Sequence, residues 1–243
     1  MIKILFLFIS LTVLAAAPAA GLDLEQLGKG KFNLGIDAQT LYTMGGRKTA
    51  DQFSLKQLRL AFEGKHPGFL DLGYRVQYEA ARSTAASYGL TDGYVEASRR
   101  DAAPELLHLK FRLGQTRRPF SYESYALGDR EIELVNRSKV VEGLVPGRDV
   151  KALAGRDVGG FLEAELAPGM REKFLVGTVG VFNGEGSGVN DKNKQKDLDL
   201  RLTARPRSWI SFGGSYTNGR LGQPAQVRDR KGVEIALKYG PFH

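Results

Sequence analysis

Apolar and polar side chains alternate without a break in Leu107-His108-Leu109-Lys110-Phe111-Arg112-Leu113. A period of two places the apolar residues on one face of a β-strand and the polar residues on the other. The same pattern occurs earlier in the chain at 58–62 and 72–79, and later at 198–203 and 233–239. The sequence therefore predicts a sheet with one apolar and one polar face, a pattern that soluble β-sandwiches also show.

Segments of this kind predict about ten strands, most of them about 9 to 15 residues long. Strands in soluble proteins usually have five or six residues, so these are long. The predicted strands lie at residues 31–44, 51–65, 71–83, 90–99, 105–114, 157–167, 173–183, 197–205, 209–218 and 228–239.

The connections between the predicted strands alternate between short and long. Tight turns rich in proline and glycine follow the even-numbered strands, for example at 66–69 and 206–208. Longer polar connections follow the odd-numbered strands, the longest at 115–155. Outer-membrane barrels have short periplasmic turns and long outer loops. We therefore predict an all-β fold, a transmembrane antiparallel β-barrel of the outer-membrane porin type. A secreted soluble β fold is the alternative.

The N-terminus predicts export. Lys3 precedes an apolar run from Ile4 to Ala17, and Ala17-Pro18-Ala19 is a cleavage site of small residues. We expect residues 1–20 to be a signal peptide and residues 21–243 to form the transmembrane β-barrel domain. An uncleaved anchor helix is the alternative, although the apolar run is short for spanning a bilayer.

Composition excludes several functional classes. The chain has no cysteine and three widely separated histidines, so we expect no disulfide, no metal site and no cofactor. No serine–histidine spacing singles out a nucleophile, and we do not expect an enzyme. Lys and Arg number 35 against 27 Asp and Glu, which suits an anionic partner. The basic residues are spread over alternating strands, so nucleic-acid binding is not expected.

A polar sheet face that encloses water predicts passive solute passage. Basic side chains on that face favour anions, because they lower the electrostatic cost of bringing an anion into a narrow channel. The connection 115–155 is the candidate constriction loop, but its seven basic and six acidic residues nearly balance. A strong anion preference would therefore depend on their arrangement. The candidate anion path comprises Arg59, Arg75, Lys110, Arg112, Arg117, Arg118, Arg148, Arg156 and Arg201.

An ordered series of motifs carries a resemblance to a known family. It includes Arg118-Pro119-Phe120-Ser121, Leu144-Val145-Pro146-Gly147-Arg148-Asp149, Gly155-Arg156-Asp157-Val158-Gly159 and Val181-Phe182-Asn183-Gly184. From about Leu58 to Tyr239 the chain resembles the phosphate-selective porin O and P family. The resemblance implies a homotrimeric channel of sixteen strands in the bacterial outer membrane. It also implies inward-folded loops that pass phosphate, polyphosphate or similar small anions.

The chain departs from that family in strand number. Ten predicted strands stand where the family has sixteen, so we expect a barrel that is incomplete at its C-terminus; a closed small barrel is the alternative. A ten-stranded barrel would leave little room for water, since lumen width grows with strand number. A non-conducting structural or adhesive barrel, with outer loops such as 184–197 contacting a partner, is therefore the alternative function.

Overall fold

The structure is a computed structural model of the 243-residue chain. It describes residues 30–43, 52–82, 89–100, 107–127, 138–145, 155–167, 174–222 and 224–238. The predicted signal peptide at residues 1–20 lies outside these ranges, and so do Arg148 and much of the candidate constriction loop.

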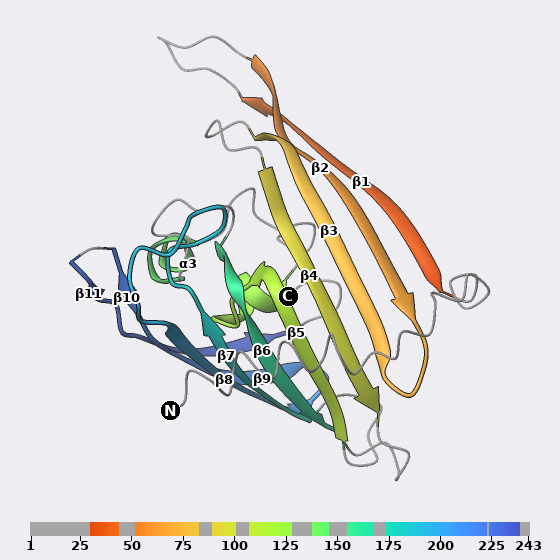
Figure 1. The fold of residues 1–243 in the computed structure, drawn as a ribbon, viewed down its shortest axis with the longest axis vertical. Coiled ribbons are helices and arrows are strands. Elements are labelled where there is room, and N and C mark those ends of the chain that lie inside the picture. The colour runs from red at the N-terminus through yellow and green to blue at the C-terminus, as the bar shows by residue number, and fades with distance from the viewer. Residues whose placement is uncertain are drawn as a thin grey trace.

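Ten strands form one antiparallel sheet, and each pairs with the next long strand along the chain (Figure 1). They are β1 (Lys31–Thr43), β2 (Gln52–His66), β3 (Asp71–Arg82), β4 (Gly89–Arg100), β5 (Leu107–Arg117), β6 (Arg156–Leu166), β7 (Leu175–Phe182), β8 (Asp197–Arg207), β9 (Ile210–Asn218) and β12 (Arg230–Leu237). A two-stranded hairpin, β10 (Arg220–Leu221) and β11 (Gln226–Val227), lies in the connection before β12.

The ten predicted strands are confirmed, and the order of pairing follows the sequence. The clearest difference is at β5, which extends to Arg117, whereas the prediction ended at residue 114. Two short helices inside the candidate constriction loop were not predicted. They are the π-helix η1 (Tyr122–Ala126) and the α-helix α3 (Lys139–Leu144).

The sheet is strongly twisted and curved, so that β1–β4 and β7–β9 lie at a large angle to each other (Figure 1). Register shifts interrupt the β1–β2 ladder after Gln39 and the β3–β4 ladder after Gln77, and such bulges increase local twist. Over the described residues the sheet is not closed, since β1 and β12 each have a single strand neighbour in it.

Burial across the sheet is the inverse of that in a soluble protein. Along β8, buried Asp197, Asp199, Arg201 and Thr203 alternate with exposed leucines. Exposure reaches 93% at Val233 on β12. The buried apolar residues of the described ranges are few: Phe120, Val141, Val145, Phe161 and Phe182. The strands therefore turn their polar side chains to the interior and their apolar side chains outward.

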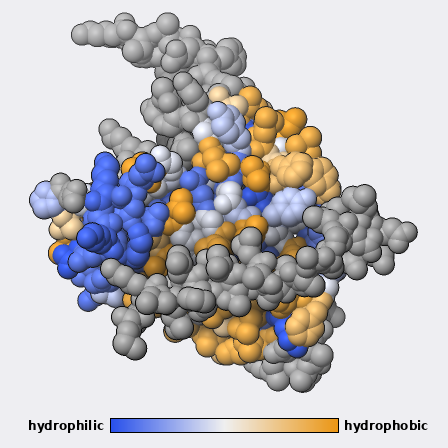
Figure 2. All heavy atoms as spheres, in the orientation of Figure 1, coloured by the Kyte–Doolittle hydropathy of each residue, from blue (hydrophilic) through white to orange (hydrophobic). Residues whose placement is uncertain are grey.

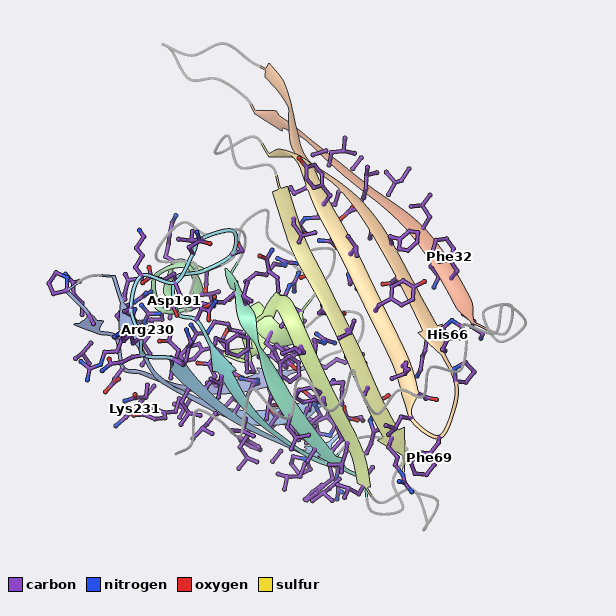
Figure 3. All side chains as sticks on the ribbon, viewed as in Figure 1. Phe32, His66, Phe69, Asp191, Arg230 and Lys231 are labelled. Atoms are coloured by element: carbon purple, nitrogen blue, oxygen red, sulfur yellow. The ribbon has the colours of Figure 1, made fainter. Side chains whose placement is uncertain are left out.

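The two ends of the sheet differ in the length of their connections. Short turns at 67–70 and 208–209 lie at one end, whereas the described parts of the long connections that follow β5, β7 and β9 lie at the other. Phe69 and Arg230 mark these two ends in Figure 3. Hydrophilic residues gather beside β10 and β11 at the long-connection end (Figure 2). Among the residues described, no helix combines the length and apolarity needed to cross a membrane.

Candidate functional site

The polar face carries a row of interacting side chains across β5–β9. Strand register places Lys110 opposite Glu163, Glu163 opposite Thr178, Thr178 opposite Arg201, and Arg201 opposite Ser215. Lys110 pairs with Glu163, and Arg201 Nη1 donates a 2.7 Å hydrogen bond to Ser215 Oγ. Residues from five strands therefore meet on one side of the sheet, because alternate residues share a face.

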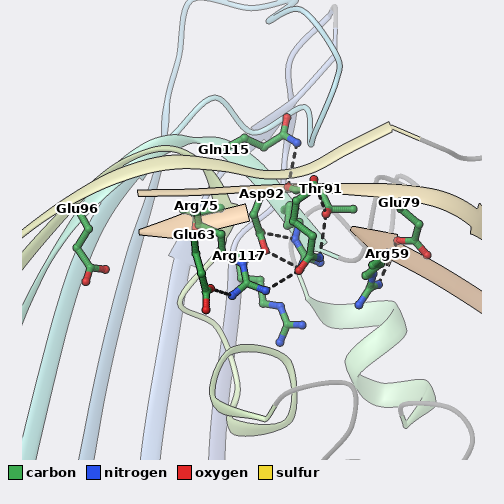
Figure 4. A network of polar contacts seen from close by, with 12 residues as sticks. Arg59, Glu63, Arg75, Glu79, Thr91, Asp92, Glu96, Gln115 and Arg117 are labelled. Atoms are coloured by element: carbon green, nitrogen blue, oxygen red, sulfur yellow. Dashed lines mark hydrogen bonds and ion pairs between the residues drawn. The ribbon is translucent and has the colours of Figure 1, made fainter. Parts of the chain in front are cut away.

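A second polar network covers β2–β4 (Figure 4). Arg59 Nη2 lies 3.1 Å from Glu79 Oε2, and both side chains are almost fully buried. Arg75 Nη1 lies 2.6 Å from Glu63 Oε2 and Nη2 donates a 2.6 Å hydrogen bond to Gln77. Both predicted arginines are thus present on the polar face, each beside a carboxylate that offsets its charge.

Asp92 joins this network to β6. Arg156 donates to both carboxylate oxygens of Asp92, at 2.6 and 3.2 Å, and Arg75 Nε lies 3.5 Å from the same carboxylate. Bidentate pairing of this kind fixes the orientation of the guanidinium relative to the carboxylate and offsets the charge of both groups. The start of β6 is therefore connected to β4 across the concave side of the sheet.

Arg112 lies between the two networks. Its Nη2 donates a 2.6 Å hydrogen bond to Glu96 and its Nη1 donates to Thr116 at 3.2 Å. The guanidinium also lies over the rings of Tyr94 and Phe161, 4.0 and 5.2 Å from their centroids. Stacking on aromatic faces leaves little freedom for the guanidinium to move.

Arg118 is enclosed by three carboxylates at the point where the chain leaves β5. Its guanidinium lies 2.6 Å from Asp197, 2.6 Å from Asp199 and 3.3 Å from Asp157, and its side chain is fully buried. Burial alone would lower the pKa of Arg118, but Asp199, with Asp197 and Asp157, raises that pKa above its ordinary value. Arg118 therefore anchors the start of the long connection to β6 and β8.

From this anchor, residues 118–127 cross the polar face towards β12; we call them the inward segment. The backbone N–H of Ser121 donates to Ser215 Oγ at 3.2 Å, and that of Tyr122 donates to Glu234 at 2.5 Å. Arg117 Nη1 donates to the carbonyl of Leu127 at 2.8 Å, which fixes the far end of η1. The inward segment thus contacts β9 and β12, which are distant from β5 in the sheet, and narrows the space on the polar side of the sheet.

Ser121 has a φ of 61°, which is uncommon for a residue other than glycine. Its hydroxyl accepts a 3.1 Å hydrogen bond from the N–H of Ser124 and caps η1. Tyr125 on η1 donates its hydroxyl proton to Glu163 at 2.7 Å. Burial, and then the charge of Glu163, raise the pKa of Tyr125 well above its usual value, so the phenol remains a donor.

A small apolar cluster lies beneath the connection. Phe120, Val141 and Val145 are buried together, and Ser138 caps α3 by accepting from the N–H of Val141 at 3.2 Å. The N–H of Ser138 in turn donates to Glu123 at 2.6 Å. Both described parts of the candidate constriction loop are therefore packed against each other.

All the predicted path residues except Arg148, which is not described, lie on the polar face or at the long-connection end of the sheet. The structure does not leave them as bare positive charges, however. Arg117 donates to backbone carbonyls, and the others are paired with one or more carboxylates. The sequence could not reveal this pairing, because it depends on strand register.

Sequence reasoning did not single out Arg228 and Arg230. Burial, followed by the positive charges of Arg230 and Arg118, lowers the pKa of Arg228 to about 10. Arg118, Arg228 and Arg230 therefore lie near one another at the long-connection end, where Asp197 and Asp199 also act on Arg230. Alternation along the last predicted strand could have placed Arg230 on the polar face, since it precedes Glu234 by four residues.

No group of three or more potential metal ligands occurs within the part of the chain that the structure describes. A comparison with protein-family models, with curated proteins and with solved structures gives no match for this chain.

Proposed function

We propose that this chain forms an outer-membrane β-barrel with a water-filled interior through which small anions, phosphate among them, diffuse. The observation that carries the proposal is the inverted burial of the ten-stranded sheet. Exposed leucine, valine and phenylalanine cover its outer face, whereas arginines and carboxylates are buried on the inner face. Such a protein is unfavourable in water, because its apolar face lacks a partner, but it suits a bilayer around an aqueous lumen.

Closure of the sheet is part of the proposal. Hydrocarbon does not tolerate unpaired backbone groups, so a spanning sheet must have no open edge. In the proposed barrel β1 and β12 are paired, either with each other or through additional strands. The resemblance to the sixteen-stranded phosphate-selective porins favours the second arrangement and, with it, a homotrimer in the bacterial outer membrane.

The proposed ion preference is modest. Most cations of the polar face already have a carboxylate partner, so their fields largely cancel for a passing ion. At the long-connection end, the positive charges of Arg230 and Arg118 act on Arg228. We propose that Arg228 and Arg230 attract anions to the entrance, and that the inward segment forms the constriction.

The test is the reversal potential of the purified protein in a planar bilayer under a KCl gradient, with phosphate then titrated. We expect an anion-selective current that phosphate reduces. Replacing Arg228 and Arg230 by glutamine should lower the anion-to-cation permeability ratio about twofold to fivefold, as expected for loss of cations near the path. Lys65→Gln, an exposed change at the short-turn end, is the matched control. Cation-selective current from the unaltered protein would reject the anion proposal.

A non-conducting structural barrel is the second candidate. The observation that favours it is the inward segment, which makes hydrogen bonds to β6, β9 and β12 and occupies the polar side of the sheet. Confirmed insertion with no current at any phosphate concentration would support this candidate over the channel.

A further inference from the structure

The outer face of the sheet is hollowed over β6–β9 and β12. A groove of about 710 Å³ lies there. Its lining is almost entirely apolar, and side chains that are exposed on the outer face dominate it. They include Leu162, Val179, Leu200, Leu202 and Val233. Thr178, Arg201 and Ser215 also border the groove, although their side chains interact with one another or with Glu163 on the polar face. The groove therefore opens on the face opposite the candidate ion path.

The groove is deep where two residues lack a side chain. Register places Val233, Gly214, Leu202, Gly177 and Ala164 in one row across the five strands. A Cβ atom added to Gly214 would meet no atom within 4 Å, and one added to Gly177 would meet only the Leu202 side chain, at 3.9 Å. Both positions therefore open onto space that methylene groups could fill.

The next row across the strands forms one wall of the groove and ends in a cation. Register aligns Lys231, Tyr216, Leu200, Val179 and Leu162. The Lys231 ammonium lies 5.8 Å from the centroid of the Tyr216 ring. Lys231 lies near the start of β12, at the long-connection end (Figure 3). The groove thus has a positive charge at its rim and apolar surface below.

Lys231 is exposed on the apolar face, and within the described residues it makes no ion pair. A lysine on the lipid face of a barrel is costly at the bilayer midplane but well tolerated at headgroup level. There, an anionic headgroup attracts it. The position of Lys231 would therefore be favourable if its ammonium contacts a lipid phosphate, and unfavourable if hydrocarbon alone surrounds it.

We propose that this groove binds an acyl chain of a membrane phospholipid whose anionic headgroup contacts Lys231. The inference rests on the proposed function, since it requires the outer face to lie in a bilayer. A second copy of the chain packed through the same face is less suitable. The outward positions of β6–β9 and β12 carry no acidic residue that could neutralise Lys231.

The experiment is a lipid titration of the folded, detergent-purified protein, followed by native mass spectrometry. The probes are phosphatidylglycerol and phosphatidylcholine with identical acyl chains. We expect one retained phosphatidylglycerol, held about fivefold more tightly than phosphatidylcholine, as expected for one lysine beside an anionic headgroup. Lys231→Gln should bring this ratio close to one. The double variant Gly214→Leu with Gly177→Leu should lose both lipids, because leucine side chains fill the groove.

Ala80→Leu is the matched control, since it adds the same side chain at an exposed position on β3, away from the groove. It should retain both lipids, and circular dichroism should give the same β content for all variants. Equal binding of the two lipids by the unaltered protein would overturn the proposal, and so would unchanged binding by the filled variant. Altered subunit stoichiometry in the filled variant would instead assign the groove to a second copy.

The failure of this inference is distinguishable from failure of the proposed function. A protein that inserts into vesicles but retains no lipid contradicts the groove assignment alone. A protein that stays dispersed in water without detergent and does not insert contradicts both.

Discussion

At the scale of single residues, Arg118 shows how buried charges stabilise a sheet whose described residues bury few apolar side chains. Its guanidinium is fully buried and contacts Asp157, Asp197 and Asp199. These carboxylates also accept backbone hydrogen bonds, from Gly184 to Asp157 and from Arg220 to Asp197. One arginine therefore offsets the charge of three carboxylates at the starts of two strands, β6 and β8, and its removal leaves buried charges without their partner.

We expect Arg118→Gln to lower the free energy of unfolding by about 3–5 kcal/mol, the cost of breaking a buried ion pair from one side. The measurement is urea unfolding in detergent or lipid vesicles. Lys192→Gln, an exposed change in the 183–196 connection, should stay within about 0.5 kcal/mol of the unaltered protein. An Arg118→Gln protein as stable as this control would show that the cluster does not hold the connection in place.

Tyr125 gives a second residue-scale prediction, in alkaline solution. Burial, and then the charge of Glu163, raise its pKa well above the usual value for tyrosine of about 10. The unfolded chain loses the phenolic proton first, so the stabilisation from this group is complete below about pH 10 and is lost as the pH rises through the folded pKa. Tyr125→Phe should therefore flatten the decline in stability above pH 10. Parallel declines in both proteins would contradict the assignment.

At the scale of elements, the alternation of apolar and polar residues was sufficient to predict the strands. It was not sufficient to predict which side chains pair across them. The alternation that includes Leu109 and Lys110 is visible without knowing which strands pair with β5, so β5 could be located from sequence alone. The pairing of Arg112 with Glu96 needs the β4–β5 register, which depends on the turn between those strands. Helix η1 lacks a periodic pattern of its own and depends on contacts with Glu163 and Glu234, distant in sequence.

The inward segment yields a prediction at this scale. Glu234 accepts the backbone N–H of Tyr122 and pairs with Arg201, so it joins the segment to β12 and β8. We expect Glu234→Ala to loosen the segment and raise single-channel conductance, with larger current fluctuations in planar bilayers. Asp71→Asn, at the short-turn end, should leave conductance unchanged. A conductance equal to that of the unaltered protein would mean that the segment does not limit the path.

At the scale of the whole molecule, the chain has a formal net charge of +8. This excess of cations is not evident on the polar face, where most basic side chains are paired with carboxylates. Inside the sheet, cations and carboxylates alternate across strands and their fields compensate. At the long-connection end, the positive charge of Arg230 lies close enough to Arg228 to lower the pKa of Arg228. In the proposed channel, selectivity would therefore arise at the entrance, where water and salt have access, and not along a continuous row of free cations.

This location predicts a strong dependence of selectivity on salt. The Debye length falls from about 10 Å at 0.1 M to about 3 Å at 1 M ionic strength, so the half-buried charges of Arg228 and Arg230 are screened more than the fully buried pairs. We expect the anion-to-cation permeability ratio, measured from reversal potentials at equal concentration gradients, to approach one in high salt. The Arg228→Gln, Arg230→Gln double variant should show a ratio near one already at low salt. A ratio that stays high in 1 M salt would instead place the selective charges inside the lumen, among the paired residues of the polar face, and would require those pairs to open when an anion passes.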